Sequence, residues 1–132
     1  MPKSDSLALT SDQDIVVARQ AVRKIARELK FSIVDQTKLI TAASELARNA
    51  LLHGGGGTLV WEIVQNNGKS GLQLTVTDKG PGIENVALAM KDGYSSGSGL
   101  GMGLPGTKRL VNEFRITSSP GLGTTVVVTR WK

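Results

Sequence analysis

A run of alternating glycines constrains this 132-residue chain more than any other feature of its sequence. The run places glycine at positions 97, 99, 101 and 103. Each glycine destabilises a helix or a strand by roughly 1 kcal/mol relative to alanine, so the run is not expected to form a regular element. Its backbone N–H groups are instead free to face phosphate oxygens. We interpret the run as a flexible lid that closes over a triphosphate.

The surrounding residues exclude two glycine-rich motifs that are easily confused with this run. The Lys-Ser/Thr pair that ends a P-loop is missing. No parallel βαβ unit is predicted around the run, as a dinucleotide-binding fold requires. The lid remains the interpretation that fits best.

Apolar residues recur at helical spacing in three segments of the chain and more weakly in a fourth. In the first segment, Ser11 is followed three residues later by Asp14, a pairing typical of a helix N-cap. Asp35 is the N-cap expected for the second helix, which Gly54–Gly57 would stop. We expect helices over residues 11–30, 35–53 and 103–112, and a short helix around Val86–Met90.

Alternation of apolar and polar residues predicts five strands. Two of them are separated by Asn66–Gly68 and Gly71, which are turn residues, so these two strands should pair as a hairpin. The expected strands cover residues 6–10, 58–65, 72–77, 113–118 and 124–131.

The order of these elements, β-α-α-β-β-α-β-β, indicates the fold class. Antiparallel strand pairs with helices collected on one face make a two-layer α/β sandwich. We expect a mixed, mostly antiparallel sheet. No repeat, linker or second domain is visible, so a single domain over residues 1–132 is expected.

Composition excludes several classes of function. The chain has no cysteine, which removes disulfides and thiolate metal sites, and its one histidine, His53, cannot build a zinc site alone. No signal peptide or membrane span is visible, so the cytoplasm is the expected location. The net charge of +5 comes from scattered Lys and Arg without interleaved aromatic residues, which argues against nucleic-acid binding.

The second predicted helix carries a carboxylate and an amide on one face. Glu45 and Asn49 are four residues apart and point the same way, at the edge of the apolar stripe. A carboxylate there can act as a general base, and an amide oxygen can bind a hard cation such as Mg²⁺. An ordinary pair on an exposed helix surface would have the same spacing.

Asp78 directly follows a predicted strand and opens the stretch Asp78–Gly82. An aspartate in this place can accept a hydrogen bond from the exocyclic amine of adenine. Gly80 and Gly82 would let the backbone approach a flat base closely. The same composition also suits a simple Pro-Gly turn. A second glycine-containing stretch, Gly121–Thr125, opens the last strand and can likewise be a nucleotide contact or a β-turn.

These four motifs are more specific together than any one of them alone. They occur in the order and spacing of the four nucleotide-binding boxes of the GHKL ATPase superfamily, whose Bergerat fold is a two-layer α/β sandwich. The motifs that resemble those boxes are Glu45…Asn49, Asp78-x-Gly80-x-Gly82, Gly99-x-Gly101-x-Gly103 and Gly123-Thr124.

This resemblance implies a role for each motif. Glu45 would be the catalytic base, and Asn49 would hold Mg²⁺. Asp78 would bind the adenine amine, with Gly82 and Thr124 lining the base. The lid over the phosphates would be formed by Gly99, Gly101 and Gly103.

Within the superfamily, the chain resembles the serine kinases of bacterial partner-switching systems, in particular the RsbT-type switch kinases of the stressosome. This resemblance implies ATP and Mg²⁺ as cofactors and phosphorylation of Ser or Thr on STAS-domain proteins. Activation of a PP2C-type phosphatase would follow release from that complex. The resembling stretches are Asp14–Gln20, Ser44–Asn49, Asp92–Ser96 and Gly103–Leu110.

Two alternatives remain open from the sequence. The first is an anti-sigma-factor kinase resembling SpoIIAB or RsbW, which also sequesters a sigma factor. The second is a non-catalytic, ATP-gated binding module, against which the retention of Glu45 argues. The cation that would contact the γ-phosphate stays unassigned among Lys79, Lys108 and Arg109.

Overall fold

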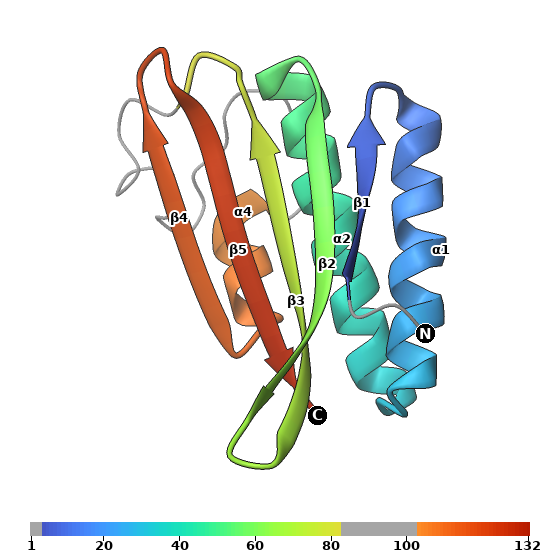
Figure 1. The fold of residues 1–132 in the computed structure, drawn as a ribbon. Coiled ribbons are helices and arrows are strands. Elements are labelled where there is room, and N and C mark those ends of the chain that lie inside the picture. Colours follow the sequence, from blue (N-terminus) through green and yellow to red (C-terminus); the bar gives the residue numbers. More distant parts are fainter. Residues whose placement is uncertain (1–3, 83–102) are drawn as a thin grey trace.

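The computed structural model describes residues 4–82 and 103–132. It is a two-layer α/β sandwich in which helices cover one face of a five-stranded sheet (Figure 1), as the sequence predicted. The strand order is β1-β2-β3-β5-β4. Every strand pairing within the described residues is antiparallel, so the mixed sheet that we expected is antiparallel there instead.

The order of the elements agrees with the predicted order. The expected short helix around Val86–Met90 lies outside the described residues. The elements are β1 (Ser4–Leu9), α1 (Asp12–Glu28), α2 (Ile33–Gly54), β2 (Gly57–Asn66), β3 (Lys69–Asp78), α4 (Gly103–Arg109), β4 (Glu113–Ser119) and β5 (Gly123–Trp131).

Helix α1 begins as predicted, with Ser11 at the N-cap. The Asp14 carboxylate accepts hydrogen bonds from the backbone N–H groups of Thr10 and Ser11, at 2.7 and 3.1 Å, and from the Thr10 hydroxyl. Hydrogen bonds from Thr10 are the main cause of the lowered pKa of Asp14. Asp14 therefore supplies an acceptor for the two backbone N–H groups that directly precede the helix.

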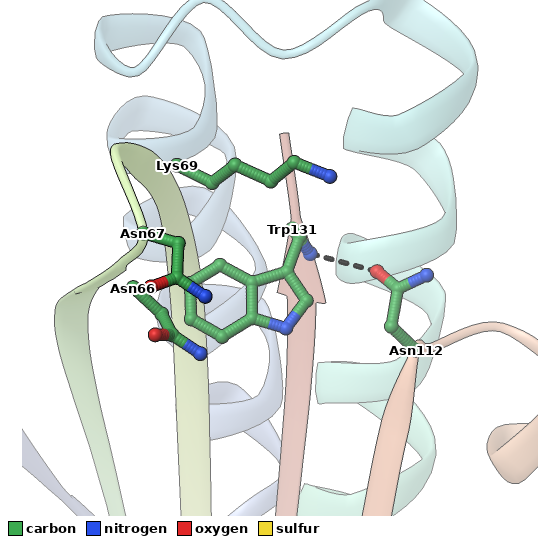
Figure 2. A pocket seen from close by; sticks show the side chains of 5 residues that line it. All are labelled: Asn66, Asn67, Lys69, Asn112 and Trp131. Atoms are coloured by element: carbon green, nitrogen blue, oxygen red, sulfur yellow. Dashed lines mark hydrogen bonds between the residues drawn. The ribbon is translucent and has the colours of Figure 1, made fainter.

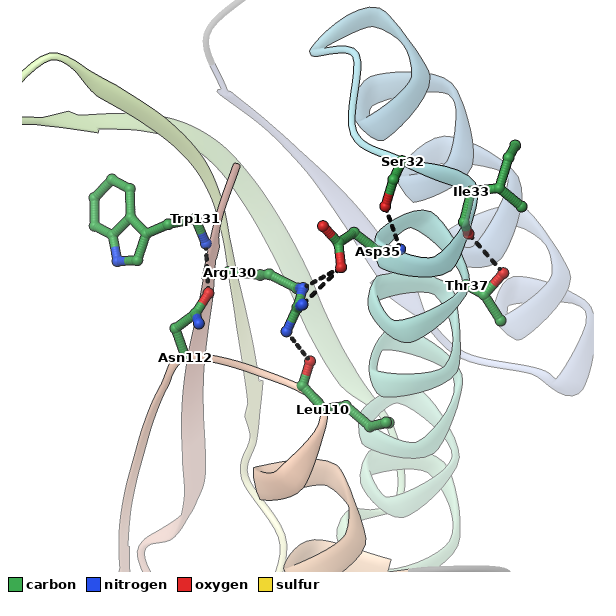
Figure 3. Close-up of polar contacts among 8 residues, drawn as sticks. All are labelled: Ser32, Ile33, Asp35, Thr37, Leu110, Asn112, Arg130 and Trp131. Carbon is green, nitrogen blue, oxygen red and sulfur yellow. Dashed lines mark hydrogen bonds and ion pairs between the residues drawn. The ribbon is translucent and has the colours of Figure 1, made fainter.

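The predicted start of α2 was wrong by three residues. Ser32 is the N-cap, and its hydroxyl oxygen accepts a hydrogen bond from the Asp35 backbone N–H at 3.1 Å. The Asp35 carboxylate is bound elsewhere: it accepts two hydrogen bonds from Arg130 of β5, from Nη2 at 2.6 Å and from Nε at 3.2 Å. Arg130 also donates from Nη1 to the Leu110 carbonyl at 3.0 Å, just after α4 (Figure 3). Arg130 thus ties α2 and the end of α4 to the sheet.

Strands β2 and β3 form the predicted hairpin. Asn67 and Gly68 both have positive φ, at 51° and 80°, which is the backbone required by a tight two-residue turn. Gly71, which we expected in the turn, is paired within β3 instead. It lies opposite Trp131 of β5, and a Cβ there would come 2.7 Å from the indole ring.

The core lies between the sheet and the helices. Alternate residues of the central strands point toward α1 and α2, as the period of two requires. The leucines of β3, Leu72 and Leu74, are fully buried in this layer, as is Val128 of β5. Among the described helices, none is both long and apolar enough to cross a membrane.

Candidate functional site

Helix α2 carries both the predicted catalytic base, Glu45, and the predicted Mg²⁺ ligand, Asn49. Glu45 is only 7% exposed, although a charged side chain is rarely buried in a protein without a role or a partner. One carboxylate oxygen, Oε1, accepts a hydrogen bond from Arg48 Nη1 at 3.1 Å. The other, Oε2, is the buried side-chain oxygen that has no hydrogen-bond partner within the described residues.

Burial raises the pKa of Glu45 above its ordinary value, and the Arg48 cation partly opposes this rise. A carboxylate with a raised pKa is a better proton acceptor than an exposed one. Oε2 is thus removed from water and has no donor among the described residues, which is an arrangement that suits a general base.

Asn49 follows one helical turn after Glu45 and is partly buried. Its side chain makes no hydrogen bond with any of the described residues. Residues 4–82 and 103–132 contain no group of three acidic or histidine side chains that could hold a metal. A lone amide still fits Mg²⁺, since this ion is usually held by one or two protein groups together with substrate phosphates.

Asp78 lies at the last position of β3, in a row with Gly57 of β2 and Thr124 of β5. Asp78 Oδ1 accepts a hydrogen bond from the Gly80 backbone N–H at 2.9 Å. The side chain packs against the end of α2, where a Cβ on Gly54 would come 2.3 Å from the Asp78 carboxyl carbon. Gly54 therefore makes the room in which this carboxylate sits beside α2.

The glycines after Asp78 are required by the protein's own backbone. A Cβ on Gly80 would lie 2.4 Å from Gly54 Cα. Gly82 has a φ of +79°, and a Cβ there would lie 2.1 Å from the Ser119 carbonyl oxygen. Both glycines thus hold the loop after β3 against neighbouring elements. Contact of Gly80 and Gly82 with a nucleotide stays a prediction.

Thr124 pairs directly with Asp78 across β3 and β5, so these two predicted contacts lie side by side at one end of the sheet. The Thr124 hydroxyl lies 2.7 Å from the Ser118 hydroxyl of β4. Gly123 has a φ of +83°, and a Cβ there would lie 2.2 Å from the Asp78 carbonyl oxygen. The close approach of β5 to Asp78 therefore depends on this glycine.

The predicted lid is only partly within the described residues. Gly99 and Gly101 lie outside them, and Gly103 is the first residue of α4. The three cations considered for the γ-phosphate, Lys79, Lys108 and Arg109, are all exposed, so burial does not distinguish among them.

Two residues of this site were missed in the sequence. Arg48 binds Glu45, and the spacing of three residues on one helix could have indicated this pair. Gly54 was interpreted only as a helix stop. It is the last residue of α2, and the αL residue that ends the helix is Gly55, with a φ of +71°.

Comparison with known proteins identifies the family of this chain. Residues 34–132 match the family of histidine kinase-, DNA gyrase B-, and HSP90-like ATPases. The chain belongs to this family. It is 44% identical over 131 residues to the serine/threonine-protein kinase RsbT of Bacillus subtilis, covering 99% of this chain and 98% of RsbT. The predicted resemblance to RsbT-type kinases is confirmed, and with it the enzyme class, a serine/threonine-protein kinase.

The chain also resembles other proteins at lower sequence identity. An anti-sigma F factor of Clostridium acetobutylicum is 28% identical over 127 residues, which cover 91% of this RsbT-type chain and 87% of that protein. The crystal structure of the RsbU and RsbW domains of a Mycobacterium tuberculosis protein superposes with a TM-score of 0.70 at 21% identity. It covers all of this chain and 33% of that longer one, and at this identity it supports the fold alone.

Proposed function

We propose that this chain is a cytoplasmic kinase that transfers the γ-phosphate of ATP to a Ser or Thr hydroxyl of a STAS-domain protein. In this proposal it acts in a partner-switching pathway, activates a PP2C-type phosphatase after release, and functions as one domain over residues 1–132. The observation that carries the catalytic part is the buried Glu45 carboxylate, whose Oε2 has no partner among the described residues. The full-length similarity to RsbT supports the choice of pathway.

The proposed reaction assigns one task to each side chain. Glu45 Oε2 accepts the proton of the incoming hydroxyl, while Arg48 holds Oε1 and keeps the carboxylate oriented. The hydroxyl oxygen forms a bond to the γ-phosphorus, the bond from that phosphorus to the bridging oxygen breaks, and ADP leaves. When bound, Mg²⁺ neutralises charge on the phosphate oxygens, and Asn49 would hold it there.

Nucleotide selection is proposed for the end of the sheet where β3 finishes and β5 begins. Asp78 would accept a hydrogen bond from the adenine amine, and its position is fixed by Gly80 and by the end of α2. Thr124, directly across from Asp78, would line the base together with Gly82.

A second candidate function is an anti-sigma-factor kinase, because anti-sigma F factors align over most of the chain at 28–32% identity. Such a protein would retain a sigma factor in an ATP-dependent complex. A pull-down of sigma factors with the purified chain and ATP distinguishes the two functions, and we expect no sigma factor to be retained.

Two substitutions test the proposed roles separately. Glu45→Gln should lower phosphate transfer by roughly 10²–10⁴-fold while ADP affinity stays within about twofold, since a general base contributes about that factor. Asp78→Asn should weaken ADP binding itself. The measurements are calorimetric nucleotide titration and radiolabel transfer to a STAS-domain protein.

Glu62→Gln is the matched control, because Glu62 is an exposed glutamate on β2. It should change neither quantity. Equal loss of binding and transfer in both Glu45→Gln and Asp78→Asn would refute the assigned roles.

A further inference from the structure

A shallow, open surface pocket of about 340 Å³ lies at the end of the sheet opposite Asp78. Strand β3 has 10 residues, so its two ends are about 30 Å apart at roughly 3.3 Å per residue. The pocket is thus separate from the proposed nucleotide site. Its lining consists of one aromatic side chain, three amides and one ammonium group: Trp131, Asn66, Asn67, Asn112 and Lys69 (Figure 2).

The indole of Trp131 is held in place by its neighbours. Its Nε1–H donates to the Glu113 carboxylate, and the Trp131 backbone N–H donates to Asn112 Oδ1 at 2.7 Å. The ring packs against Gly71 of β3, where any side chain would collide with it. The aromatic surface is therefore preorganised and costs little conformational entropy when a ligand packs on it.

The polar groups around the indole have unused hydrogen-bonding capacity. The side chains of Asn66, Asn67 and Lys69 have no hydrogen-bond or ion-pair partner within the described residues. The Asn112 amide uses its oxygen for Trp131 and keeps its NH₂ group for other acceptors. The unused groups therefore include more donors than acceptors, and one of the donors is positively charged.

We propose that this surface pocket, the Trp131 site, binds an extended acidic peptide segment of a protein partner. The indole would pack against a proline or aliphatic side chain, the amides would bond to the peptide backbone, and Lys69 would pair with a carboxylate. The chain's net charge of +5 favours the approach of an acidic segment.

The Trp131 site is on the sheet face that the helices leave open. In Figure 3, Trp131 lies on the side of β5 opposite Arg130, whose guanidinium points toward α2. A partner bound here would contact the open face without entering the helical layer. Binding at this site does not depend on phosphate transfer, so it can be tested apart from the proposed function.

The two indole N–H signals in a ¹⁵N-correlated NMR spectrum provide the test, because the chain has two tryptophans and Trp61 is buried. The probe is the capped peptide acetyl-Ala-Pro-Asp-Glu-Asp-Ala-amide, titrated into the full chain without nucleotide. The control peptide has Asn and Gln in place of the acids. Trp131→Phe assigns the signal, and Lys69→Gln removes the charge.

We expect saturable shifts of the Trp131 indole and of the Asn66 and Asn67 side-chain amides, while the Trp61 signal stays constant. Affinity should fall about threefold to fivefold in Lys69→Gln and for the neutral peptide, as loss of one exposed ion pair allows. Gly71→Ala should displace the indole and weaken binding further.

Three results would overturn the proposal. They are the absence of saturable shifts at millimolar peptide, equal affinity for the acidic and neutral peptides, and shifts produced by an oligouridylate but not by the peptide. The last result would assign the Trp131 site to single-stranded nucleic acid instead.

Discussion

The acidic side chains in the two halves of helix α2 differ in their hydrogen bonding. Near its start, Asp35 is satisfied by two hydrogen bonds from Arg130 and is part of a link to the sheet. Further along the same helix, Glu45 is buried. Within residues 4–82 and 103–132, its Oε2 has no hydrogen-bond partner and the Asn49 side chain makes no hydrogen bond. An unpaired buried polar group costs free energy, roughly 1–3 kcal/mol.

This difference separates structural residues from those available to a ligand. Asp35 of α2 is paired with a residue of strand β5, and this pair links the helix to the sheet. In the second half of the same helix, Glu45 Oε2 and the Asn49 amide have no such partner among the described residues. We infer that the polar side chains in the first half of α2 serve stability and that those in the second half serve ligand binding. The following variants test this contrast.

The largest effect is expected at the structural end. Arg130→Met removes the partner of a half-buried Asp35 and the donor to Leu110, so the free energy of unfolding should fall by about 2 kcal/mol. Urea unfolding measures this loss. ADP affinity of the folded protein should not change.

The control for this variant is a double-mutant cycle with Asp35→Asn, in which the two losses should not add. A weakened ADP affinity without a loss of stability would place Arg130 with the ligand-binding half and break the contrast.

A smaller effect is expected where α2 meets Asp78. Gly54→Ala places a methyl group 2.3 Å from the Asp78 carboxyl carbon, so Asp78 must move. ADP binding should weaken about tenfold, which corresponds to about 1.4 kcal/mol. Stability should change less, since alanine favours a helix by up to about 1 kcal/mol over glycine.

Gly55→Ala is the matched control one residue later. A methyl group on Gly55 would meet no atom within 4 Å, but the φ of +71° strains alanine there without any contact to Asp78. The substitution should cost about 1 kcal/mol of stability and leave ADP affinity unchanged. The opposite pattern, with binding lost only in Gly55→Ala, would contradict the role given to Gly54.

The smallest expected effect is a shift in the pH midpoint of phosphate transfer, and it concerns Glu45. Because burial raises the pKa of Glu45, transfer should fall as pH decreases through a midpoint above the ordinary glutamate value of 4.5. Arg48→Gln removes the cation that opposes this rise, so the midpoint should move to higher pH. Well above the midpoint, the rate should change less than about threefold, because Arg48 is partly exposed.

Stability should respond to pH with the corresponding sign. The raised pKa means that folded Glu45 binds its proton more tightly than unfolded Glu45, so wild-type stability falls as pH rises through the folded pKa. Glu45→Gln should remove this part of the pH dependence. For phosphate transfer, an unchanged pH midpoint in Arg48→Gln would show that Arg48 does not affect the pKa of Glu45.

Local signals predicted most of the fold. The capping pair at Ser11 and Asp14, the turn at Asn67 and Gly68, and the alternation within the strands all act between near neighbours. The start of α2 was different, because Ser32 and Asp35 are both good N-caps. Ser32 is the cap in the structure, and the Asp35 carboxylate instead binds the Arg130 guanidinium, which is 95 residues away in the sequence. No local rule contains that contact.

The sequence predicted which residues belong to the candidate site, but it did not predict how they are arranged in space. Spacing alone placed Glu45 and Asn49 on one side of α2. The pairing of Asp78 with Thr124 depends on the register of β3 and β5, which no nearby turn sets. Gly71 was assigned to a turn because nothing near it in the sequence reveals Trp131 opposite it in the sheet.

Strand β3 is bonded along nearly its whole length to β2 on one side and to β5 on the other. A strand fixed in this way resists bending, and its two tips, at Lys69 and Asp78, keep a constant separation. Binding of a ligand at one end of β3 should therefore leave the structure of the other end unchanged. We expect ADP and the acidic peptide to occupy the chain together, each with the same dissociation constant whether or not the other is present.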